Sequence, residues 1–381
     1  MSKGALEGIT VLDLSRLLPG PYASMILADH GARVIAIEDR RFAGEAMWGS
    51  SVNRNKEHMT LNLKSDKGRD VFFEMAASAD VILEGFRPGV TKRLGVDYGA
   101  IEKINPKIIY CSITGYGQSG PYRDAAGHDV NYLSVAGVLD LIGEAGKAPV
   151  IPGIQIADMA GGGMNAAIGI LMAVVERQRT GKGQYIDISM TDGCFSLLTL
   201  AFMLQQLTGQ TPKRSDFLLS HRYACYNIYE TRDGRYISIG AVENRFWKVL
   251  CAFFGAAEYI EYQYDDTRRQ EIIDFFRARF KEHPLAHWEE AFAGKDICWA
   301  PVKTMPEALA DPLFHTREMV AEIQNAGEKP FKALGTPIKL SRTPGSVRTI
   351  PPGFGQDTRR ILKQMGYSDS DVEALEAAGA I

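Results

Sequence analysis

Cysteine is scarce in this sequence, and its few copies form no pattern. Five cysteines are scattered over 381 residues without a CxxC pair. An odd and unpatterned set argues against a disulfide framework and against a zinc site. We therefore expect no metal cofactor, and we expect each cysteine to be a small buried apolar residue. The five are Cys111, Cys194, Cys225, Cys251 and Cys298.

The sequence also lacks an uninterrupted apolar run of membrane-spanning length and an excess of positive charge. Its start, MSKGALEGITVLDLS, has neither the apolar core nor the small-residue cleavage pattern of a signal peptide. A net charge of -3 without a basic stripe disfavours a nucleic-acid partner. We expect a soluble, cytoplasmic protein that binds neither membrane nor nucleic acid. A hydrophobic content of 45% at this length predicts a sizeable core in two lobes.

A glycine-rich dinucleotide motif is missing as well. Residues 9–14 predict a strand, residues 22–30 a helix and residues 32–38 a second strand, which together form a βαβ unit. Its last residue, Glu38, is acidic, as in dinucleotide-binding folds, but those folds need GxGxxG in the first turn. The turn here is LPGPYAS, whose prolines remove amide donors. We therefore expect no nicotinamide cofactor.

Strands alternate with helices along the first two hundred residues. This alternation predicts a doubly wound parallel sheet of the Rossmann-like α/β class. An apolar helix at 191–208 is predicted to lead out of this lobe. The remaining strands are predicted at 80–84, 107–113 and 184–190, and the helices between them at 67–78, 98–104 and 162–178.

The composition changes near residue 223 and again near residue 335. The segment YACYNIYETRDGRYISIGAV alternates on both sides of an Asp-Gly turn, which predicts a hairpin. Helices rich in aromatic residues follow, so we expect a smaller α+β domain. The predicted division is a large domain at 1–200, a linker at 201–224, a small domain at 225–330 and a C-terminal segment at 331–381.

Asp158 stands directly before a glycine-rich stretch in GIQIADMAGGGMNAAIGIL. A helix N-terminus stabilises a carboxylate through its dipole and free amides, so we expect Asp158 to be ionised near neutral pH. A helix cap explains the aspartate but leaves three glycines that each disfavour the helix by up to about 1 kcal/mol relative to alanine. Close approach of a substrate to the backbone explains them, and both interpretations stay open.

Two further residues have an acid–base or a structural interpretation. His128 lies between Gly127 and Asp129, thirty residues before Asp158. An imidazole titrates near pH 6.5 and can exchange a proton, although structural histidines are commoner. Glu243, in IGAVENRFW, either orients a histidine or caps the helix that follows it.

Basic residues lie in turns that we place at the carboxyl ends of the strands. Ligands bind at that edge of such sheets, and a phosphate-bearing ligand needs cations there. Solvated surface charge is the alternative for each of them. The loop GYGQSGPY at 115–122 is either a ligand loop or a simple turn. The basic candidates are Arg16, Arg40, Arg54, Lys56, Arg87 and Arg93.

Taken together, these segments resemble the class III coenzyme A-transferase and α-methylacyl-CoA racemase family. The matching pieces are LPGPYASMILADHGARVI, NLKSDKG, ILEGFRPGVTKRLG, ITGYGQSGP, GHDVNYLSVAGVL, DMAGGGMNAAIGIL, ERQRTGKGQYIDISMTDG, YETRDGRYISIGAVE and RRILKQMGYSDSDVEAL. The resemblance implies a Rossmann-like large domain that binds coenzyme A, a C-terminal segment that returns to it, and an interlocked homodimer. Coenzyme A then enters as part of the thioester substrate, with no permanently bound cofactor. It also makes Tyr132 a coenzyme A contact, and Arg40 stands one place after the adenine-contacting arginine of relatives.

The resemblance makes Asp158 the active-site aspartate and implies one of two chemistries. In the transferases this carboxylate attacks the thioester, and the resulting mixed anhydride is passed to an acceptor acid. In the racemases it shares the α-proton with the histidine of a GHD motif, which stands on the opposite face of the α-carbon. The intermediate is an enolate that backbone amides can stabilise.

Several features favour the racemase. The GHD motif is present at His128 with the expected spacing to Asp158, and Glu243 matches a glutamate that supports the histidine. The glycine-rich lid loop of formyl- and oxalyl-type transferases is missing, since KRSDFLLSHRYACY stands at 213–226. We therefore predict racemisation of 2-methylacyl-CoA thioesters. Transfer of coenzyme A between carboxylic acids is the alternative, and non-catalytic acyl-CoA binding is a third possibility.

Overall fold

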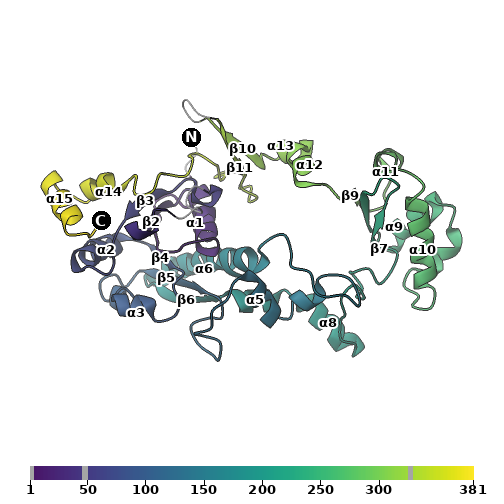
Figure 1. The fold of residues 1–381 in the computed structure, drawn as a ribbon, viewed down its shortest axis with the longest axis horizontal. Coiled ribbons are helices and arrows are strands. Elements are labelled where there is room, and N and C mark those ends of the chain that lie inside the picture. The colour runs from purple at the N-terminus through teal and green to yellow at the C-terminus, as the bar shows by residue number, and fades with distance from the viewer. Residues whose placement is uncertain (1–3, 45–49, 325–328) are drawn as a thin grey trace. The chain divides into compact units, whose positions relative to one another are not determined.

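The computed structural model describes residues 4–44, 50–324 and 329–381. The chain divides into two compact units, shown in Figure 1. The large unit comprises Met1–Val138, Pro152–Leu198 and Pro312–Ile381, and the small unit comprises Leu139–Ile151 and Thr199–Asp311. The predicted domain limits at residues 200, 224 and 330 stay a prediction.

Six parallel strands form the sheet of the large unit, in the order β3-β2-β1-β4-β5-β6. The predicted Rossmann-like sheet is therefore confirmed. Strand order reverses between β1 and β4, which is the point where open α/β sheets bind their ligands. The strands are β1 (Thr10–Asp13), β2 (Arg33–Glu38), β3 (Glu57–Thr60), β4 (Val81–Glu84), β5 (Ile109–Thr114) and β6 (Gln184–Ser189).

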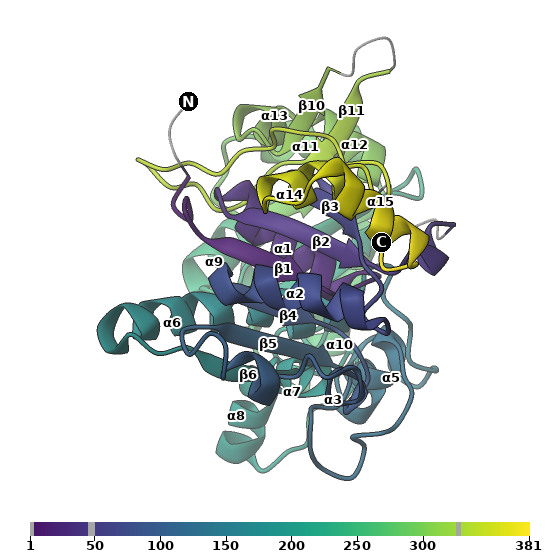
Figure 2. The ribbon, with the colours of Figure 1, turned by 90° about the vertical axis from the view of Figure 1, so that its left-hand side faces the viewer.

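Helices cover both faces of this sheet, which is why most of its strand residues are buried. Figure 2 shows α2 in front of the sheet and α14 and α15 beside β3. Side chains of these helices share one apolar core with Leu12, Ile35 and Met59 of the strands. The helices of the large unit are α1 (Pro19–Asp29), α2 (Asp66–Ser78), α3 (Val90–Leu94), α4 (Tyr98–Ile101), α5 (Asp129–Val135), α6 (Asn165–Thr180), α7 (Met190–Ser196), α13 (Pro312–Thr316), α14 (Thr358–Gln364) and α15 (Asp369–Ala377).

A π-helix, Ala157–Met164, leads directly into α6. Its three glycines are buried against α1 and α7. A Cβ atom on Gly161 would lie 2.6 Å from the Met190 carbonyl oxygen, and one on Gly163 would lie 2.8 Å from that of Pro19. The glycines therefore permit close packing of backbones, which accounts for them without a substrate.

The helix formed by Ala157–Thr180 is long and apolar enough to cross a membrane, judged by length and composition alone. In the large unit, however, it packs against α1, β5, β6 and α7.

The small unit has an α+β fold, as predicted. Its hairpin pairs Glu230 with Tyr236 across the expected Asp-Gly turn, and β9 adds a third antiparallel strand. The predicted helix at 191–208 is wrong in one respect, because it is split at residues 197–198 into α7 and α8. The elements are α8 (Thr199–Thr208), β7 (Tyr226–Glu230), β8 (Tyr236–Gly240), α9 (Asn244–Phe253), α10 (Arg269–Phe280), α11 (Leu285–Phe292), β9 (Trp299–Pro301) and α12 (Met305–Ala310).

Two features depart from the sequence-based expectations. An antiparallel pair, β10 (Val320–Ile323) and β11 (Phe331–Leu334), lies in the returning part of the chain. Among the cysteines, Cys298 is exposed while the other four are buried. The expectation of burial was therefore wrong for Cys298, which lies just before the short strand β9.

Candidate active site

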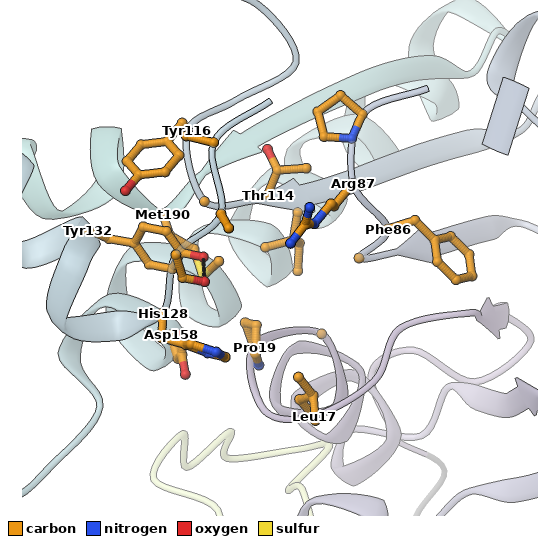
Figure 3. A pocket seen from close by; sticks show the side chains of 18 of the residues that line it. Leu17, Pro19, Phe86, Arg87, Thr114, Tyr116, His128, Tyr132, Asp158 and Met190 are labelled. Carbon is orange, nitrogen blue, oxygen red and sulfur yellow. Dashed lines mark hydrogen bonds between the residues drawn. The ribbon is translucent and has the colours of Figure 1, made fainter. Parts of the chain in front are cut away.

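A cavity of about 500 Å³ lies at the carboxyl edge of the sheet in the large unit (Figure 3). Its walls come from the loops after β1, β4 and β5, from the start of α5, and from the π-helix and α7. This is the edge where the strand order reverses. The lining includes Ser15, Arg16, Leu17, Pro19, Phe86, Arg87, Thr114, Tyr116, Arg123, His128, Tyr132, Asp158 and Met190.

The structure brings His128 and Asp158 into this one cavity. His128 is the residue before α5, and its backbone N–H donates to Asn131 Oδ1 at 3.0 Å. The next residue, Asp129, accepts the backbone N–H of Asp158 on Oδ2 at 2.9 Å. The two candidate catalytic residues are thus linked by the peptide bond between His128 and Asp129 and by one hydrogen bond.

Burial dominates the electrostatics of Asp158. Burial is the largest cause and Asp129 acts in the same direction, while His128 opposes them, and together they raise the pKa of the carboxyl to about 6. Asp158 is the second residue of the π-helix, whose cap position is Ile156. The predicted cap role is therefore wrong, and the dipole does not hold the pKa low. The carboxyl is still mostly ionised at pH 7, and it can also be protonated near that pH.

Tyr132 lies in the cavity wall and fixes the segment that carries His128. Its hydroxyl donates to the carbonyl oxygen of Gly127 at 2.5 Å. Its ring fills the space where Cβ atoms on Gly115 and Gly127 would stand, at 2.3 and 2.7 Å from ring carbons. Burial raises the pKa of this phenol to about 12, so the hydroxyl is neutral and remains a donor.

The loop after β1 is held in a strained conformation beside the cavity. Leu17 has a φ of 68°, a left-handed conformation that non-glycine residues seldom adopt. On one side of it the backbone N–H of Ser15 donates to Asp13 Oδ1 at 2.9 Å. On the other side Lys56 Nζ donates to the Pro21 carbonyl oxygen at 3.0 Å. Such strain persists only where the surroundings impose it, and it is commonest at functional sites.

Two of the predicted coenzyme A contacts do not reach the cavity. The Lys56 side chain is fully buried next to Asp13, and burial lowers its pKa to about 8. Arg54 is buried in an ion pair with Asp29, at 2.7 Å. Both side chains are buried in contacts with α1, through Asp29 for Arg54 and through the Pro21 carbonyl oxygen for Lys56. Neither side chain is therefore exposed to a ligand.

A second, smaller cavity of about 210 Å³ adjoins the first. It is mainly apolar and has basic residues along it. Arg16 and Phe86 line both cavities. The complete lining is Leu14, Arg16, Ile37, Glu38, Asp39, Arg41, Phe42, Leu61, Leu63, Lys64, Phe86, Val90 and Leu94.

The other predicted basic residues differ in whether they line one of the two cavities. Arg87 lines the larger cavity, whereas Arg93 lies in the last turn of α3 and lines neither cavity. Arg40 lines neither cavity, while its neighbour Arg41 lines the second one. Three further basic residues line the cavities and were not predicted from the sequence: Arg41, Lys64 and Arg123. Lys64 could have been predicted from the sequence, since it lies in NLKSDKG, one of the segments that resemble the family.

Glu243 lies in the small unit, directly before α9. Its backbone carbonyl oxygen accepts from Phe246 at 3.0 Å, while its side chain makes no capping bond to the helix. Side-chain capping, the structural alternative for this residue, is therefore absent. Its support of His128 stays a prediction. Among the described residues, 4–44, 50–324 and 329–381, no group of three His, Cys, Asp or Glu side chains is arranged to hold a metal ion.

Comparison with known proteins gives consistent results along the whole chain. The family model described as CoA-transferase family III matches residues 6–358. The chain is 35% identical over 378 residues to the alpha-methylacyl-CoA racemase of Homo sapiens, covering 98% of this chain and 96% of that protein. It is 34% identical over 396 residues to the succinyl-CoA:glutarate CoA-transferase of Mus musculus, covering 99% and 90%. A solved CAIB/BAIF family protein from Brucella suis is similar with a TM-score of 0.83 at 28% identity, covering 96% of this chain and 100% of that one.

Proposed function

Because this chain belongs to CoA-transferase family III, we propose that it is a racemase of 2-methylacyl-CoA thioesters. It is an acyl-CoA enzyme, and both racemases and CoA-transferases are among its relatives. The observation that carries the racemase proposal is the presence of two proton-exchanging groups, His128 and Asp158, in one cavity. A transferase needs the carboxylate alone.

In the proposed reaction one base removes the α-proton and the other returns a proton to the opposite face. The C–H bonding electrons move into the thioester as an enolate, and they form the new C–H bond when the second proton arrives. Asp158, with a pKa near 6, can act as a carboxylate base in one direction and as an acid in the other. His128 takes the complementary role, and Glu243 positions it.

The two cavities suggest how coenzyme A lies. The thioester belongs beside Asp158 in the larger cavity, and the adenine belongs in the smaller apolar one, which is of suitable size for a purine. Arg41 and Lys64 line the smaller cavity and Arg87 lines the larger one. These cations suit the phosphates of the ligand.

A class III transferase is the second candidate, supported by the similarity to the succinyl-CoA:glutarate CoA-transferase. In it Asp158 attacks the thioester carbonyl carbon, the C–S bond breaks, and coenzyme A leaves as the thiolate. The acyl group is then bound to Asp158 as a mixed anhydride. An acceptor carboxylate attacks the acyl carbonyl carbon of this anhydride, which frees Asp158 and forms an anhydride of the two acids. The thiolate then attacks the acceptor's carbonyl carbon, so that the acceptor's thioester forms and the donor acid leaves as its carboxylate.

The decisive experiment incubates a 2-methylacyl-CoA with the enzyme in heavy water without any carboxylic acid. The racemase proposal predicts α-deuterium uptake and loss of optical purity, with both lost in Asp158→Asn. A transferase instead requires an acceptor acid, and hydroxylamine traps its acyl-aspartate. No deuterium uptake from several branched substrates, together with acid-dependent coenzyme A exchange, would replace the first candidate by the second.

We also propose that the chain forms the interlocked homodimer implied by its family. Each unit exposes large apolar side chains, such as Met172 and Val175 on α6 and Phe202 and Leu207 on α8, all at least 60% exposed. Soluble monomers seldom leave so much apolar helix surface in water. A second copy of the chain is the proposed cover. A cytoplasmic location without membrane or nucleic-acid partners belongs to the same proposal.

A further inference from the structure

Glu38 occupies the position that first suggested a nicotinamide cofactor, yet its carboxylate is engaged elsewhere. It ends β2 and is buried. Arg16 Nε donates to its Oε1 at 2.7 Å. Its Oε2 lies 3.9 Å from Nε2 of His58, a buried imidazole whose pKa is lowered to about 3 by burial. A carboxylate held in this way is turned toward Arg16 instead of toward a ribose diol.

Arg16 is fixed on a second side by an aromatic ring. Its guanidinium carbon lies 3.4 Å from the centre of the Phe42 ring, which is a stacking distance. The ion pair through Nε and the ring together define the plane of the guanidinium. A guanidinium fixed in its plane loses less entropy when it binds phosphate through its terminal nitrogens.

Arg16 also lies between the two cavities, since its side chain belongs to the lining of both. If the thioester lies in one cavity and the adenine in the other, the part of coenzyme A between them must pass Arg16. In coenzyme A that part includes the diphosphate, which joins the pantetheine arm to the adenosine. A cation at this crossing therefore faces the diphosphate.

We propose that Glu38 is a positioning residue that holds Arg16 against the diphosphate of coenzyme A. This inference rests on the proposed acyl-CoA function and names a recognition device within that site. Glu38 lines the smaller cavity together with Arg16, and it acts on the diphosphate through Arg16. The acidic residue at the end of β2 thus acts on a diphosphate indirectly, by holding an arginine. In dinucleotide-binding enzymes the residue at this position hydrogen-bonds the ribose directly.

The charge of Glu38 makes the proposal sharply testable. A carboxylate near a diphosphate repels it, so removal of the charge alone would tighten the binding of coenzyme A. Loss of positioning would weaken that binding. The sign of the change therefore separates a positioning role from a purely electrostatic one.

The experiment compares Glu38→Ala, Glu38→Gln and Arg16→Ala on two substrates, an acyl-CoA and the same acyl group on pantetheine. Glu38→Ala is expected to raise KM for acyl-CoA about tenfold with kcat nearly unchanged, as for loss of one charge-assisted contact. Glu38→Gln keeps a hydrogen-bond acceptor and should lie nearer to the wild type. With acyl-pantetheine, which has no diphosphate, all three variants should match the wild type.

Three controls keep the result interpretable. Glu57→Ala removes a partly exposed carboxylate of the adjacent strand β3 and should leave both substrates unaffected. Glu38→Ala combined with Arg16→Ala should be no worse than Arg16→Ala, because the two residues act as one unit. Calorimetry with free coenzyme A measures the same binding without turnover, so the inference can be judged even if racemisation is absent.

Tighter coenzyme A binding in Glu38→Ala would overturn the proposal. Equal losses on acyl-CoA and acyl-pantetheine would also overturn it, since they would indicate a general structural defect. Additive effects of the Glu38 and Arg16 substitutions would do the same.

Discussion

The buried carboxyl of Asp158 must be ionised to remove a proton, and its raised pKa predicts when that holds. For the enantiomer whose α-proton faces Asp158, the rate of α-proton exchange should be independent of pH above pH 7. It should fall about tenfold per pH unit well below pH 6, as the carboxylate is protonated. The measurement is α-deuterium uptake from each enantiomer across pH 5–8. A profile without any limb near pH 6 for either enantiomer would contradict this assignment.

Glu84 gives a stability prediction of its own. It ends β4, is buried and accepts the N–H of Phe86 at 2.7 Å. Burial raises its pKa to about 7, against the hydrogen bonds from Ser112 and Phe86. The protonated form is therefore favoured by folding. Its stabilising effect is complete below the unfolded pKa of about 4.5 and is lost as the pH rises through 7.

Replacement of Glu84 by glutamine removes the charge and keeps the shape. Glu84→Gln is expected to raise the unfolding free energy by about 1–3 kcal/mol at pH 8. At pH 4.5 the difference should vanish. Urea unfolding at the two pH values measures it, and Glu373→Gln, at an exposed position of α15, is the matched control. A variant that is less stable than the wild type at pH 8 would show that Glu84 is held as a carboxylate.

At this scale, sequence motifs predicted the candidate catalytic residues but not their environment. His128 and Asp158 were found because their residue types, spacing and flanking glycines match a family pattern. The pKa of Asp158 could not be predicted, because it depends on burial by distant segments. The burial of Arg54 and Lys56 could not be predicted for the same reason, since the local sequence of a basic residue does not reveal that it pairs with Asp29 or Asp13.

At the scale of elements, the glycines of the π-helix are predicted to be irreplaceable for packing. In Gly163→Ala the new Cβ would meet the Pro19 carbonyl oxygen, a backbone atom that cannot rotate away. We expect a loss of about 1–3 kcal/mol in unfolding free energy, as for overpacking, and lower activity because the loop after β1 must shift.

Gly169→Ala, in the same continuous helix, is the matched control. Its Cβ would lie 3.3 Å from Cγ2 of Ile186, a side-chain methyl group that needs to move by only a few tenths of an ångström. Alanine gains up to about 1 kcal/mol of helix propensity there, so stability should change little or rise. Denaturant unfolding and α-exchange rates measure both variants. Equal destabilisation by the two substitutions would refute the special role given to close packing in the π-helix.

The elements that the sequence predicted well are those with strong local patterns. The alternation around Asp233 and the strand predicted at 107–113 correspond to strands of the structure, the latter to β5. Strand β3 was missed because its sequence, EHMT, has no apolar alternation. Its register comes from pairing with β2 and from bonds to the distant Asp357. Long-range partners of that kind leave no local signal.

For the whole molecule, the chain connectivity and the exposed helix surfaces bear on assembly. The large unit is built from three stretches of chain, so the small unit is inserted between Leu198 and Pro312 except for residues 139–151. Such an insertion follows from no local rule of sequence. It was expected only because the family resemblance implied a C-terminal segment that returns.

The proposed dimer predicts that a charge on the apolar face of α8 will prevent assembly. Phe202, 60% exposed in the single chain, would be buried by a second copy, and a glutamate there would bury an unpaired charge. Light scattering should give the mass of two chains for the wild type and of one chain for Phe202→Glu, with a concentration-dependent loss of activity. Gln206→Glu places the same charge on an exposed polar position of the same helix and should remain dimeric. A wild-type mass of one chain at micromolar concentration would remove the dimer from the proposed function. An unchanged mass in Phe202→Glu would exclude this face of α8 from the interface.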